Sequence, residues 1–109
     1  MSEVQITVEG EDAITATQEL LAIPGISAKL ETEGEASKEG TLATIATIVG
    51  LTVGVIEIAE RIYKWYQKAK ESRPGKTFDA VIESPTGRLL LEDATIEEIC
   101  EILKALPRD

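Results

Sequence analysis

The sequence predicts a single α+β domain over residues 1–109, with a four-stranded, mostly antiparallel sheet and three helices. Two observations favour this class. Several short segments alternate apolar with polar residues, as half-buried strands do, whereas other segments repeat their apolar residues at helical spacing. Gly and Pro separate these segments. A chain of 109 residues has room for one core that needs no disulfide or metal to fold. We expect the order β-α-β-α-β-β-α.

Three elements are expected in the first third of the chain. The stretch 4-VQITV-8 alternates apolar with polar residues and predicts a strand. The run 12-DAITATQELLAI-23 predicts a short helix, which ends there because 24-PG-25 cannot continue it. The stretch 26-ISAKLETE-33 alternates again and predicts a second strand. Residues 34–40 have the composition of a surface loop.

A long apolar helix is expected in the middle of the chain. The stretch 41-TLATIATIVGLTVGVIEIA-59 contains no proline, so we predict one helix that continues to the loop 72-SRPGK-76. Gly50 and Gly54 weaken such a helix without ending it. Because this helix is apolar nearly all round, it must be covered on every side.

The last third of the chain predicts a hairpin followed by a closing helix. Residues 78–92 form two short apolar-rich runs on either side of 84-SPTG-87, where Pro and Gly suit a tight turn. The sequence 95-TIEE-98 is a capping box, in which a threonine and a glutamate satisfy each other's backbone donors. We therefore expect the final helix to begin there and to end near Leu106.

Composition argues against several classes of function. A net charge of −9 disfavours nucleic acid as a partner, because phosphate binding needs a basic face. The chain has no histidine, which is the commonest general base and a usual ligand of catalytic zinc. Cys100 falls on the apolar stripe of the last helix, where a cysteine behaves as a small hydrophobic residue. We expect no enzyme, no cofactor and no metal.

A cytoplasmic location is expected. The N-terminus lacks a basic region followed by a short apolar run, which a secretory signal would have. The single Cys100 cannot form an intramolecular disulfide, as is usual for cytosolic proteins.

A membrane-associated protein is the alternative that the central helix leaves open. The stretch before Glu57 is shorter than the ~20 apolar residues of a spanning helix. Extension over 41–59 would have to bury Glu57, although Tyr63, Trp65 and Tyr66 among lysines resemble a membrane border. A small membrane-anchored protein that uses helix 41–59 is therefore kept beside the main prediction.

Self-association is the environment that we favour for this helix. Small residues recur every four positions at Ala46, Gly50 and Gly54, and they would form a groove that lets a second helix approach closely. The predicted sheet covers only one side of the helix, so another copy of the chain is expected to cover the rest. The predicted interaction residues are Ala46, Gly50, Val53, Gly54 and Ile56, with Tyr63, Trp65 and Tyr66 as anchors.

The second half of the chain carries a family resemblance. The ending 81-VIESPTGRLLLEDATIEEICEILKAL-106, preceded by 61-RIYKWYQKAKESRPG-75, resembles the effector-associated constant component family of bacterial conflict systems. The order of elements matches over nearly the whole chain, and the most specific pieces are Trp65, the turn 84-SPTGR-88 and the acidic 92-ED-93. The resemblance implies an adaptor-like module found with effectors such as proteases and nucleases. It implies no catalytic residues.

We therefore predict a non-enzymatic homo-oligomeric adaptor that recruits or regulates an effector in a prokaryotic defence system. Charge distribution supplies a further alternative. Residues 61–76 hold six basic residues against Glu71 alone, so the rest of the chain is strongly acidic. Such a surface is typical of an acidic inhibitor or immunity protein that binds a basic enzyme.

Overall fold

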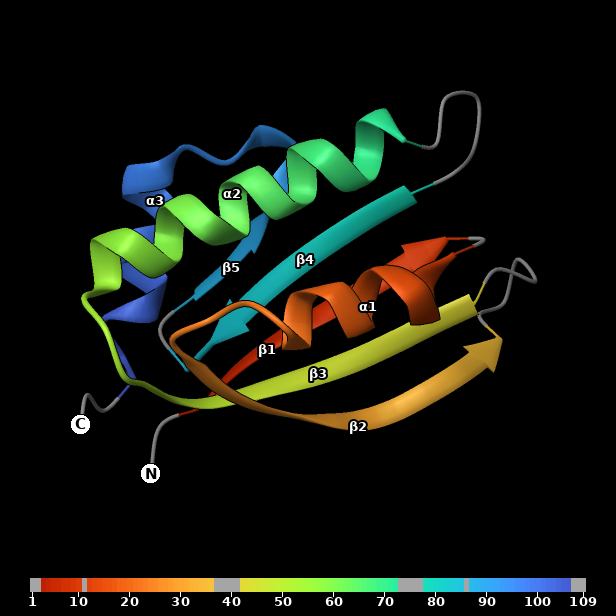
Figure 1. Cartoon of the computed structure of the whole chain (residues 1–109), viewed down its shortest axis with the longest axis horizontal. Helices are drawn as coiled ribbons and strands as arrows, with labels where there is room; N and C mark the ends of the chain where they lie inside the picture. Colours follow the sequence, from red (N-terminus) through yellow and green to blue (C-terminus); the bar gives the residue numbers. More distant parts are fainter. Residues whose placement is uncertain (1–2, 11, 37–41, 73–77, 86, 107–109) are drawn as a thin grey trace.

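The computed structural model describes residues 3–10, 12–36, 42–72, 78–85 and 87–106. Figure 1 shows helices α1 and α2 lying side by side on one face of a sheet. The elements follow in the order β1 (Val4–Gly10), α1 (Ala13–Leu21), β2 (Ile26–Ala36), β3 (Leu42–Leu51), α2 (Val55–Glu71), β4 (Phe78–Ser84), β5 (Gly87–Leu90), a short 3-10 turn (Leu91–Asp93) and α3 (Ile96–Leu103).

The α+β class is confirmed, but the sheet has five strands and the prediction of four was wrong. Its strands lie in the order β2-β3-β1-β4-β5, and every neighbouring pair is antiparallel. The first strand of the chain is therefore the central one. The additional strand, which was not predicted, is β3. It occupies much of the segment that was expected to be helical.

The prediction of a long apolar helix from residue 41 was wrong in its first half. Residues 42–51 form strand β3, and helix α2 begins only at Val55. The segment is rich in β-branched Thr, Ile and Val, which prefer the pleated surface of a strand. Because β3 pairs with strands on both sides and carries apolar residues on both of its faces, its apolar residues do not alternate clearly, and such a run resembles a buried helix.

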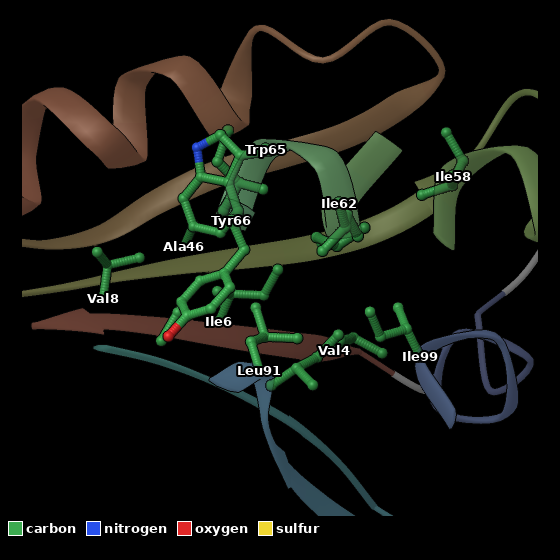
Figure 2. Close-up of a cluster of buried hydrophobic side chains, with 14 of the residues drawn as sticks. Val4, Ile6, Val8, Ala46, Ile58, Ile62, Trp65, Tyr66, Leu91 and Ile99 are labelled. Atoms are coloured by element: carbon green, nitrogen blue, oxygen red, sulfur yellow. The ribbon is translucent and has the colours of Figure 1, made fainter. Parts of the chain in front are cut away.

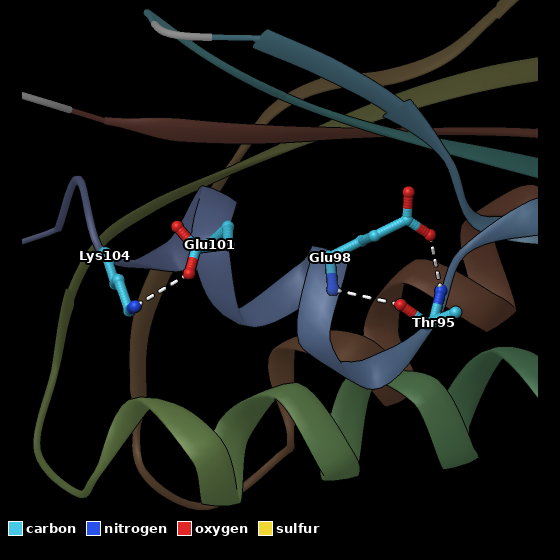
Figure 3. A network of polar contacts seen from close by, with 4 residues as sticks. All are labelled: Thr95, Glu98, Glu101 and Lys104. Carbon is cyan, nitrogen blue, oxygen red and sulfur yellow. Dashed lines mark hydrogen bonds and ion pairs between the residues drawn. The ribbon is translucent and has the colours of Figure 1, made fainter.

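The other elements are close to their predictions. The hairpin β4–β5 is present, and Ser84 pairs with Gly87 at its turn. Helix α3 has the expected capping box, in which the Glu98 amide donates to Thr95 Oγ1 at 3.2 Å and the Thr95 amide donates to Glu98 Oε1 at 3.0 Å (Figure 3). The expected loop is partly strand, since β2 continues to Ala36, and residues 37–41 and 73–77 lie outside the described residues.

One hydrophobic core fills the space between the sheet and the helices. Alternate residues of β1 point into it, namely Val4, Ile6 and Val8, and they meet side chains of α2 and α3 such as Ile62 and Ile99 (Figure 2). Helix α3 packs on α2 and on the hairpin β4–β5. Within the part of the chain that the structure describes, the three helices therefore cover the same face of the sheet, and none of them covers the other.

The turn before β2 fixes where α2 begins. Gly25 has a φ of 97°, a conformation that glycine adopts more readily than other residues. Its carbonyl oxygen accepts a hydrogen bond from the Thr52 amide at 2.8 Å, and the Pro24 oxygen accepts one from Arg61 Nη1 at 2.6 Å. The end of β3 and the first turns of α2 are thus held against the same tight turn.

Candidate interaction surfaces

The predicted interaction residues separate into buried and exposed groups. Ala46 and Gly50 are buried in β3, where they cannot form the expected groove on a helix, because no helix passes through them. Val53, Gly54 and Tyr63 are partly buried. Ile56 is 64% exposed in the first turn of α2. It is the predicted residue that presents the most apolar surface to solvent.

Trp65 and Tyr66 belong to the core. The Trp65 indole is 8% exposed, and Tyr66 stacks on Phe78 with ring centroids 5.7 Å apart. Figure 2 shows both rings directed inward from α2. In the folded chain these two aromatic residues therefore hold α2 on the sheet, and their side chains offer little surface to a partner.

Ile56 lines two hollows on the α2–α3 side of the molecule. The larger hollow has a volume of about 640 Å³, and the smaller about 230 Å³. Ile56 and Cys100 line both of them. The remaining lining residues of the larger hollow are Gly54, Val55, Glu57, Lys104 and Leu106. An exposed apolar side chain therefore sits directly beside concave apolar surface.

Charges next to these hollows are neutralised mainly within the chain. Glu57 pairs with Arg61 at 3.6 Å, one turn along α2. Lys104 Nζ donates to Glu101 Oε1 at 2.8 Å on the α3 side (Figure 3). Glu97 adds one acidic group at the smaller hollow. The region around Ile56 thus carries little net charge for a protein this acidic.

The uncovered face of the sheet is a second exposed surface, and sequence reasoning missed it. Register places Ile45, Thr7, Val81 and Leu90 beside one another on four successive strands, on the side away from the helices. Leu90 is 50% exposed, and Val49, further along the same face of β3, is 40% exposed. The available sequence signal was two consecutive leucines in the short second strand of the hairpin, since one of them must face away from the core.

Acidic side chains flank this row, which is apolar except for Thr7. On one side of the row, Glu9 and Asp79 follow two residues away from Thr7 and Val81 on the same strands. Both are exposed, and they lie directly opposite each other. On the other side, exposed Gln5 lies opposite Glu83, which is in turn opposite Arg88. The face therefore combines an apolar centre with mostly acidic edges.

Two basic residues of α2 are engaged within the chain. Arg61 is engaged with Glu57 and Pro24, and Lys70 Nζ donates to Glu92 Oε1 at 3.1 Å. This hydrogen bond to Glu92 raises the pKa of Lys70. Within the predicted basic run, Arg61 is thus bonded to Pro24 and to the preceding turn of α2, and Lys70 is bonded to Glu92.

The described residues contain no group of three or more His, Cys, Asp or Glu side chains placed to hold a metal ion. Within the same residues, the structure has no helix that is both long and apolar enough to cross a membrane. The membrane alternative relied on a helix over residues 41–59, and residues 42–51 of that stretch are a strand.

Comparison with known proteins found no matching family model, curated protein or solved structure. The resemblance to the effector-associated constant component family therefore stays a prediction that rests on the residues quoted for it.

Proposed function

We propose that this chain is a non-enzymatic adaptor that self-associates through the start of α2 and thereby holds effector proteins together. The observation that carries the proposal is the position of Ile56, which is exposed in the first turn of α2 and lines two hollows. A second copy of the chain, related by a two-fold axis, would place its own Ile56 in one of these hollows.

A protruding side chain beside a hollow is self-complementary. In a two-fold dimer the same patch contacts itself, so each copy supplies one Ile56 and one hollow. Complete burial of an isoleucine that was exposed contributes about 1.5–3 kcal/mol, and the symmetry gives this contribution twice. The apolar lining at Val55, Cys100 and Leu106 is suited to receive it.

Electrostatics favour this patch over other parts of the surface for contact between copies. Two chains of net charge −9 repel each other, and the repulsion is weakest where charges are neutralised locally. Beside the hollows, Glu57 and Lys104 each have an oppositely charged partner in their own chain. The uncovered sheet face, in contrast, would bring Glu9 and Asp79 of both copies together.

The effector part of the proposal comes from the family resemblance alone. The turn 84-SPTGR-88 and Trp65 before the basic run are its most specific pieces. They imply an effector of the protease or nuclease type in a prokaryotic defence system. An assembling adaptor would act by raising the local concentration of such effectors.

Light scattering coupled to size-exclusion chromatography tests the self-association. We expect the mass to rise from the 11.8 kDa of one chain toward twice that value as concentration increases over about a hundredfold range. Ile56→Asp should keep the protein at the mass of one chain, since a carboxylate would have to be buried in the apolar hollow.

Leu90→Asp is the matched control. It adds the same charge at a similarly exposed apolar residue on the opposite face, and it should leave the mass unchanged. A wild-type chain that stays monomeric at every concentration, or an oligomer that persists in Ile56→Asp and is lost in Leu90→Asp, would remove the start of α2 from the proposal.

A further inference from the structure

We propose that the uncovered face of the sheet binds a basic amphipathic helix of a partner protein. This face is formed by β3, β1, β4 and β5 on the side away from the helices. It shares no residue with the lining of the hollows around Ile56. The proposal therefore does not depend on self-association, and either can fail alone.

The apolar row has the dimensions of a short helix. Ile45, Thr7, Val81 and Leu90 are neighbours on successive strands. Strands lie about 4.8 Å apart, so the row is roughly 14 Å long. Ten residues of α-helix extend about 15 Å, which matches this length. A helix that lies along the row would cross the strands and cover the exposed half of Leu90.

The acidic rows lie where the edges of such a helix would be. Successive residues on one face of a strand are about 7 Å apart, so Glu9 and Asp79 form one border of the row and Glu83 the other. Glu9 and Asp79 are direct cross-strand partners, and like charges in that position destabilise a sheet. A lysine or arginine from a partner would convert this repulsion into attraction.

The charges of the face select against a second copy of the same chain. Among the described residues of these four strands, exposed acids at Glu9, Asp79 and Glu83 outnumber the exposed base on this face, which is Arg88. Two such faces would place carboxylates against carboxylates. A basic partner gains attraction along the same borders, and its approach is accelerated by the overall charge of −9.

A helix fits this face better than an extended peptide does. The main-chain groups of β1, β3 and β4 are engaged with neighbouring strands, so the face offers side chains and few free main-chain donors or acceptors. An extended segment lying on the face would leave its own amides without partners, which is costly. A helix satisfies these groups internally and presents an apolar stripe between two basic borders.

The test uses a synthetic fluorescent helical peptide that carries a leucine stripe flanked on both sides by lysines. Its binding to the full chain is followed by fluorescence anisotropy. We expect Leu90→Asp to weaken binding about tenfold, the size of effect typical of a central apolar contact. Attraction by net charge alone would give the opposite result, because this substitution makes the protein more acidic.

A second variant separates binding from folding. The double substitution Glu9→Gln with Asp79→Asn removes the like-charge pair, so it should unfold at the same or a higher denaturant concentration. It should nevertheless bind the peptide several-fold more weakly and show a smaller loss of affinity with added salt. Circular dichroism of each variant confirms that the fold is retained.

Three outcomes of the peptide experiments, and one of the light-scattering experiment, would overturn the proposal. The first is peptide binding that is unchanged or tighter in Leu90→Asp. The second is equal weakening in Ile56→Asp, which adds the same charge away from the face. The third is equal binding of a control peptide in which glutamates replace the lysines. If Leu90→Asp instead breaks a wild-type dimer, the occupant is a second copy and the proposed partner is wrong.

Discussion

The indole Nε1 of Trp65 donates a hydrogen bond to the carbonyl oxygen of Ala16 at 2.9 Å, and this contact joins α2 to α1 across 49 residues of sequence. Both groups are buried. The same ring contacts Phe78 edge-on at a centroid distance of 6.4 Å. Trp65 thus links both large helices and the strand β4.

Trp65→Phe should destabilise the protein. The phenyl ring cannot donate the hydrogen bond to Ala16, and it leaves part of the indole's space empty. Loss of the donor alone costs about 1–3 kcal/mol in a buried site. Denaturant unfolding followed by circular dichroism measures the change. Tryptophan fluorescence cannot be used, because Trp65 is the only tryptophan and the substitution removes it. Tyr63→Phe, at a partly exposed position of the same helix, should shift stability by less than about 0.5 kcal/mol. Equal effects of the two substitutions would contradict the structural role given to the indole.

Two Gly→Ala substitutions should have opposite effects. A Cβ at Gly25 would lie 2.7 Å from Val53 Cγ2 and 2.9 Å from Ile58 Cδ1, and the φ of 97° is strained for alanine. We expect Gly25→Ala to cost about 1–3 kcal/mol. At Gly87 a Cβ meets nothing within 4 Å, so Gly87→Ala should be neutral or stabilise by up to about 1 kcal/mol. Thermal unfolding of both variants decides the point, and a tolerated Gly25→Ala would mean that the turn can relax.

Local signals predicted most of the fold. The hairpin turn at Ser84 and the capping box of Thr95 with Glu98 depend on neighbouring residues only, and both were found as expected. Strand β3 could not be identified in this way, because its assignment depends on pairing with β1 and β2 on either side. A helix over residues 42–51 would place the small residues Ala46 and Gly50 in a groove, whereas in the strand they allow tight packing instead.

The candidate surfaces show the same limit. Ile56 was among the predicted interaction residues. It lies in α2, as the prediction of a helix there required, and its side chain is exposed. Trp65 and Tyr66 lie between lysines in the sequence, a pattern typical of a border, yet helical geometry turns them inward while the lysines turn outward. The uncovered sheet face could not be predicted without the strand order, because its apolar row takes residues from four separate strands.

Tyr66 should make the stability of the protein depend on alkaline pH. Burial is the main cause that raises the pKa of its phenol, and the nearby Lys70 charge partly opposes this effect. The unfolded phenol ionises near pH 10. Above that pH the unfolded chain has lost a proton that the folded chain still holds, so stability falls until the higher folded pKa is passed.

Tyr66→Phe isolates this contribution. Unfolding by denaturant is measured from neutral pH to about pH 11, and the variant should lose less stability than the wild type at the alkaline end. At neutral pH its stability should change by less than about 1 kcal/mol, since the Tyr66 hydroxyl has no hydrogen-bond partner among the described residues. Identical pH profiles for the two proteins would show that Tyr66 ionises as easily when folded as when unfolded.

Cys100 provides a chemical probe of the proposed self-association. Its half-buried thiol lines both hollows beside Ile56, so a second copy seated there would cover it. We expect its reaction with excess iodoacetamide, an uncharged reagent, to slow as protein concentration rises. The fractional reduction in the reaction rate should equal the fraction of chains in the oligomer, because only chains outside the oligomer expose the thiol.

Ile56→Asp should abolish this concentration dependence. The absolute rate of this variant is less informative, since the substitution also changes the lining of the hollows beside the thiol. Leu90→Asp, on the opposite face, should react with the same concentration dependence as the wild type. If the wild-type rate is constant at concentrations where light scattering detects an oligomer, the copies meet through a surface that leaves Cys100 open, and the hollows beside Ile56 are not the contact.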